Sequence, residues 1–127
     1  MIPAEFGYAV PESLDEAIRM LHENGEEAKL LAGGHSLIPL MKLRLAAPTL
    51  LVDLRRIPGL HGIQREDGEY RIGAMTPHAT LQVTPELGLA CRVAGTIADQ
   101  QVRNRGTIGG SLAHGDPASD LPAVLLA

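Results

Sequence analysis

Aromatic residues are scarce in this chain: Phe6, Tyr8 and Tyr70 are the only ones, and tryptophan is absent. The hydrophobic core must therefore be built from aliphatic side chains, and nucleic-acid binding by stacked aromatic rings is disfavoured. The formal net charge is −4 and basic residues form no run, so binding to a nucleic-acid phosphate backbone is not expected either.

Cysteine is limited to Cys91, which argues against a disulfide framework and against a cysteine-based metal or iron–sulfur site. No apolar stretch has the length that crossing a bilayer requires, and the N-terminus lacks the basic and apolar regions of a signal peptide. We therefore expect a soluble cytoplasmic protein without a membrane span. Its 127 residues, 45% of them hydrophobic, suffice for one domain or two small lobes.

Strand and helix patterns alternate in the N-terminal part of the chain. Ser13 and Glu16 have the spacing of a capping box, and Gly25 is placed to end the helix that follows. Strands are expected at residues 5–10, 28–32 and 49–54, with a short helix at 37–45 between the last two. The nearly continuous apolar run at 49–54 is typical of a buried parallel strand, so this part is predicted to be an α/β unit.

The pattern changes after residues 55–60, where we expect a boundary between two lobes. Asp67-Gly68 lies between two alternating runs, residues 60–65 and 69–74, which predicts a hairpin. A short helix is expected at 78–83 and one of about three turns from Leu87 to Ile97.

A last helix begins at Leu121 and is still apolar where the sequence stops, so we expect the chain to be cut there. Its apolar side chains would then be exposed or buried against another chain, which includes self-association. These side chains are Leu121, Val124, Leu125 and Leu126.

Two glycine-containing segments are the most informative feature of the chain. The first, Ala32-Gly33-Gly34-His35-Ser36-Leu37, joins a predicted strand to a predicted helix. Glycine permits positive φ and close approach of a ligand, so several N–H groups can point into one concavity and bind an anion, most often phosphate. The alternative is an ordinary strand-to-helix turn, and neither a dinucleotide fingerprint nor a Walker A loop is present.

The second segment, Thr107-Ile108-Gly109-Gly110-Ser111, is interpreted as a loop of the same kind. Arg103 and Arg105 precede it, and their guanidinium groups suit an anion, although a solvated face or a subunit contact would explain them equally. Two such loops in one small chain favour a ligand with two phosphates. We expect the two arginines to act in docking or in supporting the loop and not in catalysis.

Polar residues follow the second segment. His114 and Asp116 are too few to predict a metal site, whereas Asp120 could accept hydrogen bonds from a ribose or an adenine, or could cap the helix after it. A serine hydrolase is a further alternative, but no serine lies in a Gly-x-Ser-x-Gly elbow. Its candidate residues would be Ser36, Ser111, His35, His78 and His114.

Several motifs occur in an order that one protein family shows: Phe6-x-Tyr8 with Pro11, Ala32-Gly33-Gly34-His35-Ser36-Leu37-Ile38-Pro39, Leu43-Arg44, Asp53-Leu54, Ile72-Gly73-Ala74-Met75-Thr76-x-His78-Ala79, and Val102 through His114. Together they resemble the FAD-binding medium subunit of molybdenum hydroxylases, in particular the aerobic carbon monoxide dehydrogenase type. Xanthine dehydrogenase carries a related domain. The resemblance covers the whole chain.

The resemblance implies an α+β fold, the two-lobed FAD-binding domain of the vanillyl-alcohol oxidase (PCMH) type, incomplete at its C-terminal end. Residues 1–56 would be the first lobe and 57–127 the second. It further implies FAD as cofactor, with no catalytic residue and no metal ligand in this chain. The implied FAD-binding residues are Ala32, Gly33, Gly34, His35, Ser36, Leu37, Ile97, Thr107, Ile108, Gly109, Gly110, Ser111 and Asp120.

The activity implied is electron transfer within a complex. A large subunit with the molybdenum cofactor would oxidise substrate, a small subunit with 2Fe-2S clusters would relay electrons, and FAD would pass them to an external acceptor. The alternative is a truncated, non-catalytic remnant or interaction module without flavin, since family members continue well beyond Ala127. We expect this chain alone to be a poor flavoenzyme.

Overall fold

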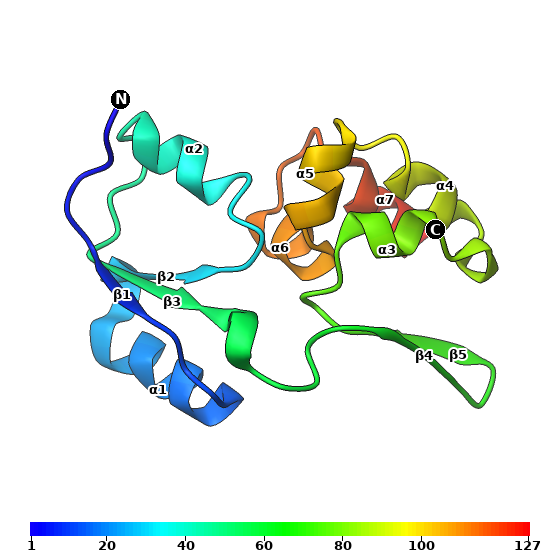
Figure 1. Ribbon diagram of the computed structural model, residues 1–127, viewed down its shortest axis with the longest axis horizontal. Helices are drawn as coiled ribbons and strands as arrows, with labels where there is room; N and C mark the ends of the chain where they lie inside the picture. Colours follow the sequence, from blue (N-terminus) through cyan, green and yellow to red (C-terminus); the bar gives the residue numbers. More distant parts are fainter. The chain divides into compact units, whose positions relative to one another are not determined.

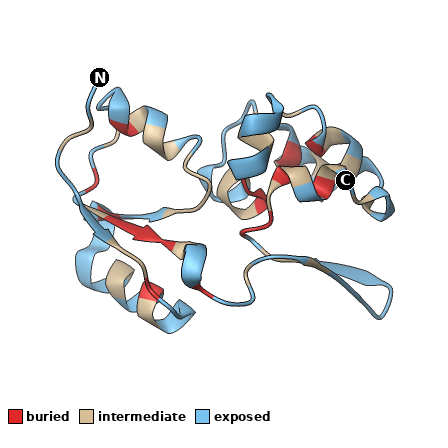
Figure 2. Cartoon of the chain, viewed as in Figure 1, coloured by how far each residue is buried: buried red, intermediate tan, exposed pale blue.

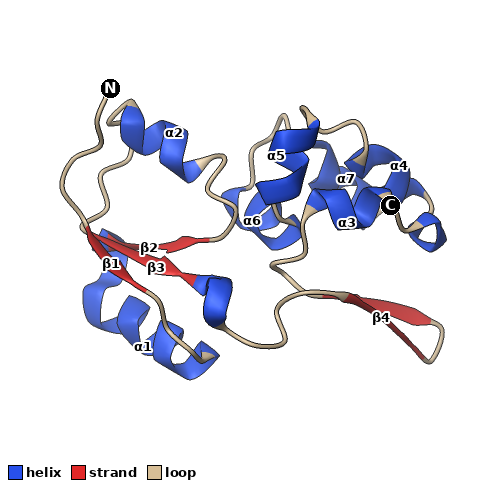
Figure 3. Ribbon diagram, in the orientation of Figure 1, coloured by secondary structure: helices blue, strands red, loops and turns tan.

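A three-stranded parallel sheet forms the centre of the first of two units, Met1–Pro58 and Gly59–Ala127, into which the computed structural model divides residues 1–127. Unit 1 also contains two α-helices and two short 3₁₀ helices (Figures 1 and 3). In chain order its elements are β1 (Gly7–Ala9), α1 (Leu14–Asn24), η1 (Gly25–Glu27), β2 (Ala28–Leu31), α2 (Leu37–Lys42), β3 (Leu50–Asp53) and η2 (Leu54–Arg56).

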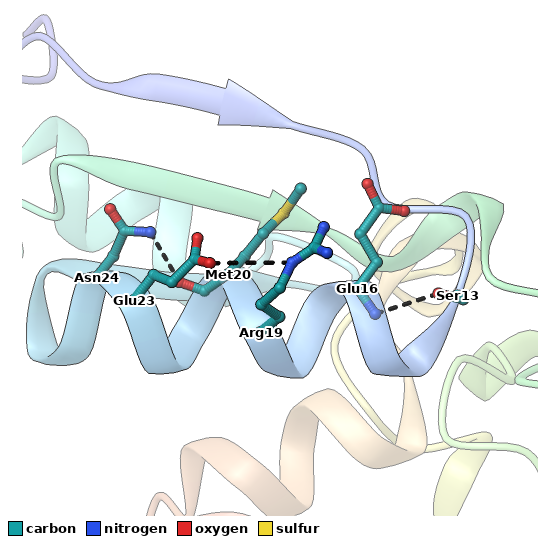
Figure 4. A network of polar contacts seen from close by, with 6 residues as sticks. All are labelled: Ser13, Glu16, Arg19, Met20, Glu23 and Asn24. Carbon is teal, nitrogen blue, oxygen red and sulfur yellow. Dashed lines mark hydrogen bonds and ion pairs between the residues drawn. The ribbon is translucent and has the colours of Figure 1, made fainter.

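Helix α1 begins and ends where its sequence predicts. Ser13 Oγ accepts a hydrogen bond from the N–H of Glu16 at 3.1 Å, as Figure 4 shows, and Glu16 Oε2 accepts one from the N–H of Glu12 at 3.0 Å. These two bonds satisfy N–H groups that no helix carbonyl can reach. At the other end Gly25 takes φ 56°, and its N–H donates to the Leu21 carbonyl. The capping box therefore determines the first turn of α1.

Strand β3 is the central strand, in the order β1-β3-β2, and both of its neighbours run parallel to it. Strand β3 is coloured mostly as buried in Figure 2, and its residues Leu51 and Val52 are almost completely buried, as expected for a strand covered on both faces. Helix α1 lies along one face of the sheet (Figure 1) and contributes the buried Ala17. The predicted strand at residues 5–10 is shorter, because only Gly7–Ala9 pair with β3.

Unit 2 combines a hairpin with five short α-helices. The hairpin turn consists of Asp67 and Gly68, with φ values of 50° and 83°, which is the requirement of a tight two-residue turn. In chain order the elements are β4 (Ile63–Glu66), β5 (Glu69–Ile72), α3 (His78–Gln82), η3 (Pro85–Leu87), α4 (Leu89–Ala94), α5 (Gln100–Arg105), α6 (Ile108–His114) and α7 (Asp120–Leu126).

The core of unit 2 is aliphatic. Leu81, Ala94 and Ile108, which lie on α3, α4 and α6, are buried together, and Ile63 and Ile72 of the hairpin pack against this cluster. Leucine, isoleucine and alanine thus supply the apolar area that aromatic residues supply in many small domains.

Three expectations about unit 2 are corrected. The predicted three-turn helix from Leu87 to Ile97 is broken by Gly88, whose φ of 57° ends η3, and α4 stops before Gly95. The segment at Thr107–Ser111 is not a loop, because α6 begins at Ile108. Leu121 is fully buried, while Leu125 and Leu126 remain exposed. Helix α7 thus packs its first apolar side chain within the unit, in contact with α4 and α6.

Close packing explains why residue 109 is glycine. A Cβ atom added there would lie 2.6 Å from both the Cβ and the carbonyl oxygen of Ala74. Contacts this short force the backbone apart, so α6 can approach the segment after β5 only without a side chain at this position.

We predict that Gly109→Ala lowers the free energy of unfolding by about 1–3 kcal/mol, the usual cost of overpacking a core. Gly95→Ala is the matched control, since an added Cβ there meets nothing nearer than 3.4 Å. It should change stability by less than about 0.5 kcal/mol. Urea unfolding followed by circular dichroism measures both, and a wild-type midpoint for Gly109→Ala would contradict the prediction.

Candidate functional site

The segment from Ala32 to Leu37 connects the end of β2 to the start of α2. Gly34 takes φ 80°, in the left-handed region that favours glycine. A Cβ atom on Gly34 would lie 3.2 Å from Ile38 Cγ1, so the helix also approaches this residue closely. His35 and Ser36 are exposed, while their neighbours are half-buried.

Five consecutive N–H groups in this segment, those of Gly33 to Leu37, donate to no other group of unit 1. The hydrogen bonds of α2 begin only with Ile38, whose N–H donates to the Gly34 carbonyl at 3.0 Å. Ser36 stands at the N-cap, but its side chain makes no capping bond. Unpaired donors at a glycine turn are the chemistry that binds an anion, and the anion site at this segment stays a prediction.

The start of α6 in unit 2 differs from this segment in the hydrogen bonding of its backbone N–H groups. Its first-turn N–H groups all have acceptors inside the unit: Ile108 to the Thr76 carbonyl at 3.1 Å, Gly109 to the Ala74 carbonyl at 2.8 Å, and Gly110 to Thr107 Oγ1 at 3.0 Å. Ser111 donates its N–H to the Thr107 carbonyl at 3.0 Å. The expected similarity between the two glycine segments is therefore wrong, because these backbone donors are already used.

Ser111, on the same helix, is half-buried. Its Oγ lies 3.2 Å from Nε2 of His78, the first residue of α3. His78 is 3% exposed, and its Nδ1 is buried without a hydrogen-bond partner. Burial lowers the pKa of His78 below its ordinary value, because the charged imidazolium would lose its hydration.

This pair does not make a hydrolase. A serine–histidine nucleophile needs a third group that orients the imidazole, and Nδ1 of His78 has no partner. The other candidates of that alternative, His35, Ser36 and His114, take part in no serine–histidine contact. The pairing of His78 with Ser111 was missed from the sequence, since the two residues lie 33 positions apart. No local pattern marks this pairing, and only the structure shows that Gly106 leaves room for the ring, since a Cβ there would lie 2.9 Å from His78 Cδ2.

The two arginines have different surroundings. Arg103 donates through one guanidinium nitrogen to the carbonyls of Ile97 at 2.8 Å and Ala98 at 3.0 Å, and Ala98 has a positive φ of 44°. Arg105 is exposed. Both lie on α5, a helix that was not predicted although Asp99 caps it by accepting from the N–H of Val102 at 2.9 Å.

The remaining predicted residues lie at the ends of helices. Ile97 is half-buried in the turn after α4. Asp120 is the first residue of α7 and is exposed, and Ser119 occupies the N-cap in its place. The carboxylate of Asp120 makes no hydrogen bond or ion pair within unit 2, whereas Asp116 accepts from the N–H of Ala118 at 2.8 Å and so serves a local turn.

Comparison with known proteins identifies the class to which this fold belongs. Residues 4–127 match the family described as the FAD binding domain in molybdopterin dehydrogenase, and the chain belongs to this family. FAD is therefore the cofactor to which the chain's family points. None of the helices has the length and apolarity to cross a membrane.

Individual relatives are oxidoreductase subunits. The chain is 52% identical to the carbon monoxide dehydrogenase medium chain of Hydrogenophaga pseudoflava, covering 100% of this chain and 46% of the relative. It is 48% identical to subunit alpha of the 6-hydroxypseudooxynicotine dehydrogenase complex of Paenarthrobacter nicotinovorans, covering 100% and 44%. The chain thus spans a little under half the length of these relatives.

A solved structure of carbon monoxide dehydrogenase from Hydrogenophaga pseudoflava matches the fold with a TM-score of 0.95. The match has 52% sequence identity and covers 98% of this chain and 45% of that chain. It confirms the expected α+β fold class of the FAD-binding subunit. The division into two FAD-binding lobes and the individual FAD-binding residues stay predictions.

We predict that Arg103→Ala destabilises unit 2 by about 1.5–3 kcal/mol, the usual value of hydrogen bonds made by a charged group. Arg105→Ala on the same helix is the control and should stay within about 0.5 kcal/mol of wild type. Thermal unfolding of both variants measures the two losses of stability. Equal losses of stability in the two variants would show that Arg103 does not support the turn at Ile97 and Ala98.

We also predict a pH dependence of stability from His78. Its pKa is lowered by burial, so below about pH 6.5 the unfolded chain binds a proton that the folded chain does not. The free energy of unfolding should therefore fall as the pH drops through this value and level off below the folded pKa. His78 contributes at most about 1.4 kcal/mol per pH unit to the slope of the unfolding free energy against pH. His78→Gln should remove this part of the slope, whereas His61→Gln, at an exposed position, should keep it.

Proposed function

We propose that this chain is the FAD-binding part of the medium subunit of a molybdenum hydroxylase complex and that it serves in electron transfer. The observation that carries the proposal is the run of unpaired N–H groups from Gly33 to Leu37, in a chain whose family is defined by FAD binding. The segment fits the pyrophosphate of FAD, since phosphate oxygens accept hydrogen bonds and glycine leaves no Cβ in their way.

Each unit contributes residues to the proposed FAD-binding set. Unit 1 contributes the unpaired backbone donors and the hydroxyl of Ser36. In unit 2 the N–H groups at the start of α6 are already bonded, so its hydrogen-bond donors are side chains, and its two glycines belong to the set by the family resemblance alone. The proposed set is Ala32, Gly33, Gly34, His35, Ser36, Leu37, Ile97, Thr107, Ile108, Gly109, Gly110, Ser111 and Asp120.

Within this set Asp120 is proposed to bind the ribose or adenine end of the cofactor. Its exposed carboxylate is without a partner in unit 2, so both oxygens are open to accept hydrogen bonds. Ile97 supplies an apolar contact.

Bound FAD supplies the redox chemistry, accepting electrons and releasing them to an external acceptor. The residues of this chain bind and orient it. By the family resemblance, we propose that the partners are a large subunit with the molybdenum cofactor and a small subunit with 2Fe-2S clusters. Relatives named for carbon monoxide and for 6-hydroxypseudooxynicotine share this domain, so we infer that the substrate is selected outside it.

The proposal is tested by titrating the purified chain with FAD and recording the visible spectrum. Weak uptake of flavin, recovered as FAD on denaturation, is the expected result. A folded chain that remains colourless at high FAD concentration would refute cofactor binding and favour a non-catalytic interaction module. Sedimentation in the same samples reports whether the exposed Leu125 and Leu126 lead to self-association.

Ser36→Ala is predicted to lower FAD affinity by roughly tenfold or more, because a hydrogen bond to a charged group is worth about 1.5–3 kcal/mol. Its stability should be unchanged, since the hydroxyl makes no capping bond. Ser13→Ala is the matched control with the opposite pattern. It should cost about 1 kcal/mol of stability and leave FAD affinity at the wild-type value. Equal FAD affinity in all three proteins would exclude Ser36 from the site.

A further inference from the structure

Backbone and side-chain contacts fix the position of His78. Its own backbone N–H donates to the Gly106 carbonyl at 3.0 Å, and the absence of a side chain on Gly106 leaves room for the ring. Nε2 lies 3.2 Å from Ser111 Oγ, and Nδ1 is buried without a partner. This is the one titratable side chain of unit 2 that is nearly fully buried, and neither the fold nor the proposed cofactor site accounts for it.

The unpartnered Nδ1 indicates which nitrogen carries the proton. A neutral imidazole has one N–H donor and one acceptor nitrogen. Were Nδ1 protonated, a buried N–H would have no acceptor, which is rarer in folded proteins than an acceptor without a donor. The tautomer with the proton on Nε2 avoids that cost, and it is also the form that free neutral histidine prefers. Nε2–H then donates to Ser111 Oγ.

This direction of the bond determines what Ser111 can do. Its oxygen accepts from His78, so its own proton points elsewhere. The usual acceptor for a serine in a helix is a carbonyl one turn back, but Ser111 Oγ makes no such bond here. Ser111 as a residue is half-buried and therefore partly accessible. Since the first-turn N–H groups of α6 are all used, this hydroxyl is a donor that α6 can still offer to a ligand.

We propose that His78 is a positioning residue that holds Ser111 as a hydrogen-bond donor to a phosphate oxygen of the bound cofactor. The proposal rests on the proposed function, because it names how unit 2 takes part in FAD binding. Within unit 2 the donor is the Ser111 hydroxyl, whose direction the buried imidazole of His78 determines.

The first test is the tautomer itself, measured without cofactor. In the chain labelled with ¹⁵N-histidine, long-range ¹H–¹⁵N spectra distinguish a protonated from an unprotonated ring nitrogen, and the loss of a signal in His78→Gln assigns it. We expect Nε2 protonated and Nδ1 unprotonated at neutral pH. The reverse pattern would overturn the proposal, because Ser111 would then donate to the ring and not to a ligand.

The second test is FAD titration of variants. Ser111→Ala should lower affinity by roughly tenfold, and His78→Asn, whose shorter amide does not reach Ser111, should do the same. The double variant should lose no more than either single one, as expected of two residues that act through one bond. His78→Gln is the conservative variant, since its amide nitrogen can take the place of Nε2, and it should bind FAD within about threefold of wild type.

Wild-type affinity in His78→Asn, or equal losses in His78→Gln and His78→Asn, would contradict the positioning role. Ser111→Ala leaves the buried ring in place and so keeps the test informative if a His78 variant does not fold. If the wild-type chain takes up no FAD but shows the expected tautomer, the proposed function fails while the pairing of His78 with Ser111 stands.

Discussion

The backbone contact between the segment after β5 and the start of α6 is the constraint on which unit 2 depends. The carbonyls of Ala74 and Thr76 accept from Gly109 and Ile108, and the missing Cβ of Gly109 makes this approach sterically feasible. The same approach buries Ile108 in the core and brings Ser111 to His78. This contact thus determines both the packing of α6 and the surroundings of its one serine.

Two similar glycine sequences serve different purposes in this chain. At Gly33-Gly34 the backbone donors stay unpaired, and the positive φ of Gly34 turns the chain between β2 and α2. At Gly109-Gly110 the donors are consumed, and glycine is needed for close packing. The same pair of glycines therefore accompanies free backbone donors in unit 1 and bonded backbone donors in unit 2.

Local signals predicted much of the fold. Ser13, Glu16 and Gly25 define α1 through bonds that span four residues or fewer, and Asp67-Gly68 adopts the positive φ values that the hairpin turn requires. These elements depend on neighbours in the sequence, so a pattern can reveal them. Helix α5 was not predicted although its cap, Asp99, is equally local, because this helix has six residues, none of them buried, and so shows no apolar period.

The sequence by itself determined the family, the parallel sheet of unit 1 and the hairpin, and the family resemblance supplied the candidate FAD-binding residues, which stay predictions. Only the tertiary structure decided which of their donors remain available. The acceptors for Ile108 and Gly109 lie far away along the chain, as does His78 from Ser111, and no local pattern records such distances. Whether a glycine N–H is free or bonded depends on what packs against it, and packing partners are chosen by the fold of the whole unit.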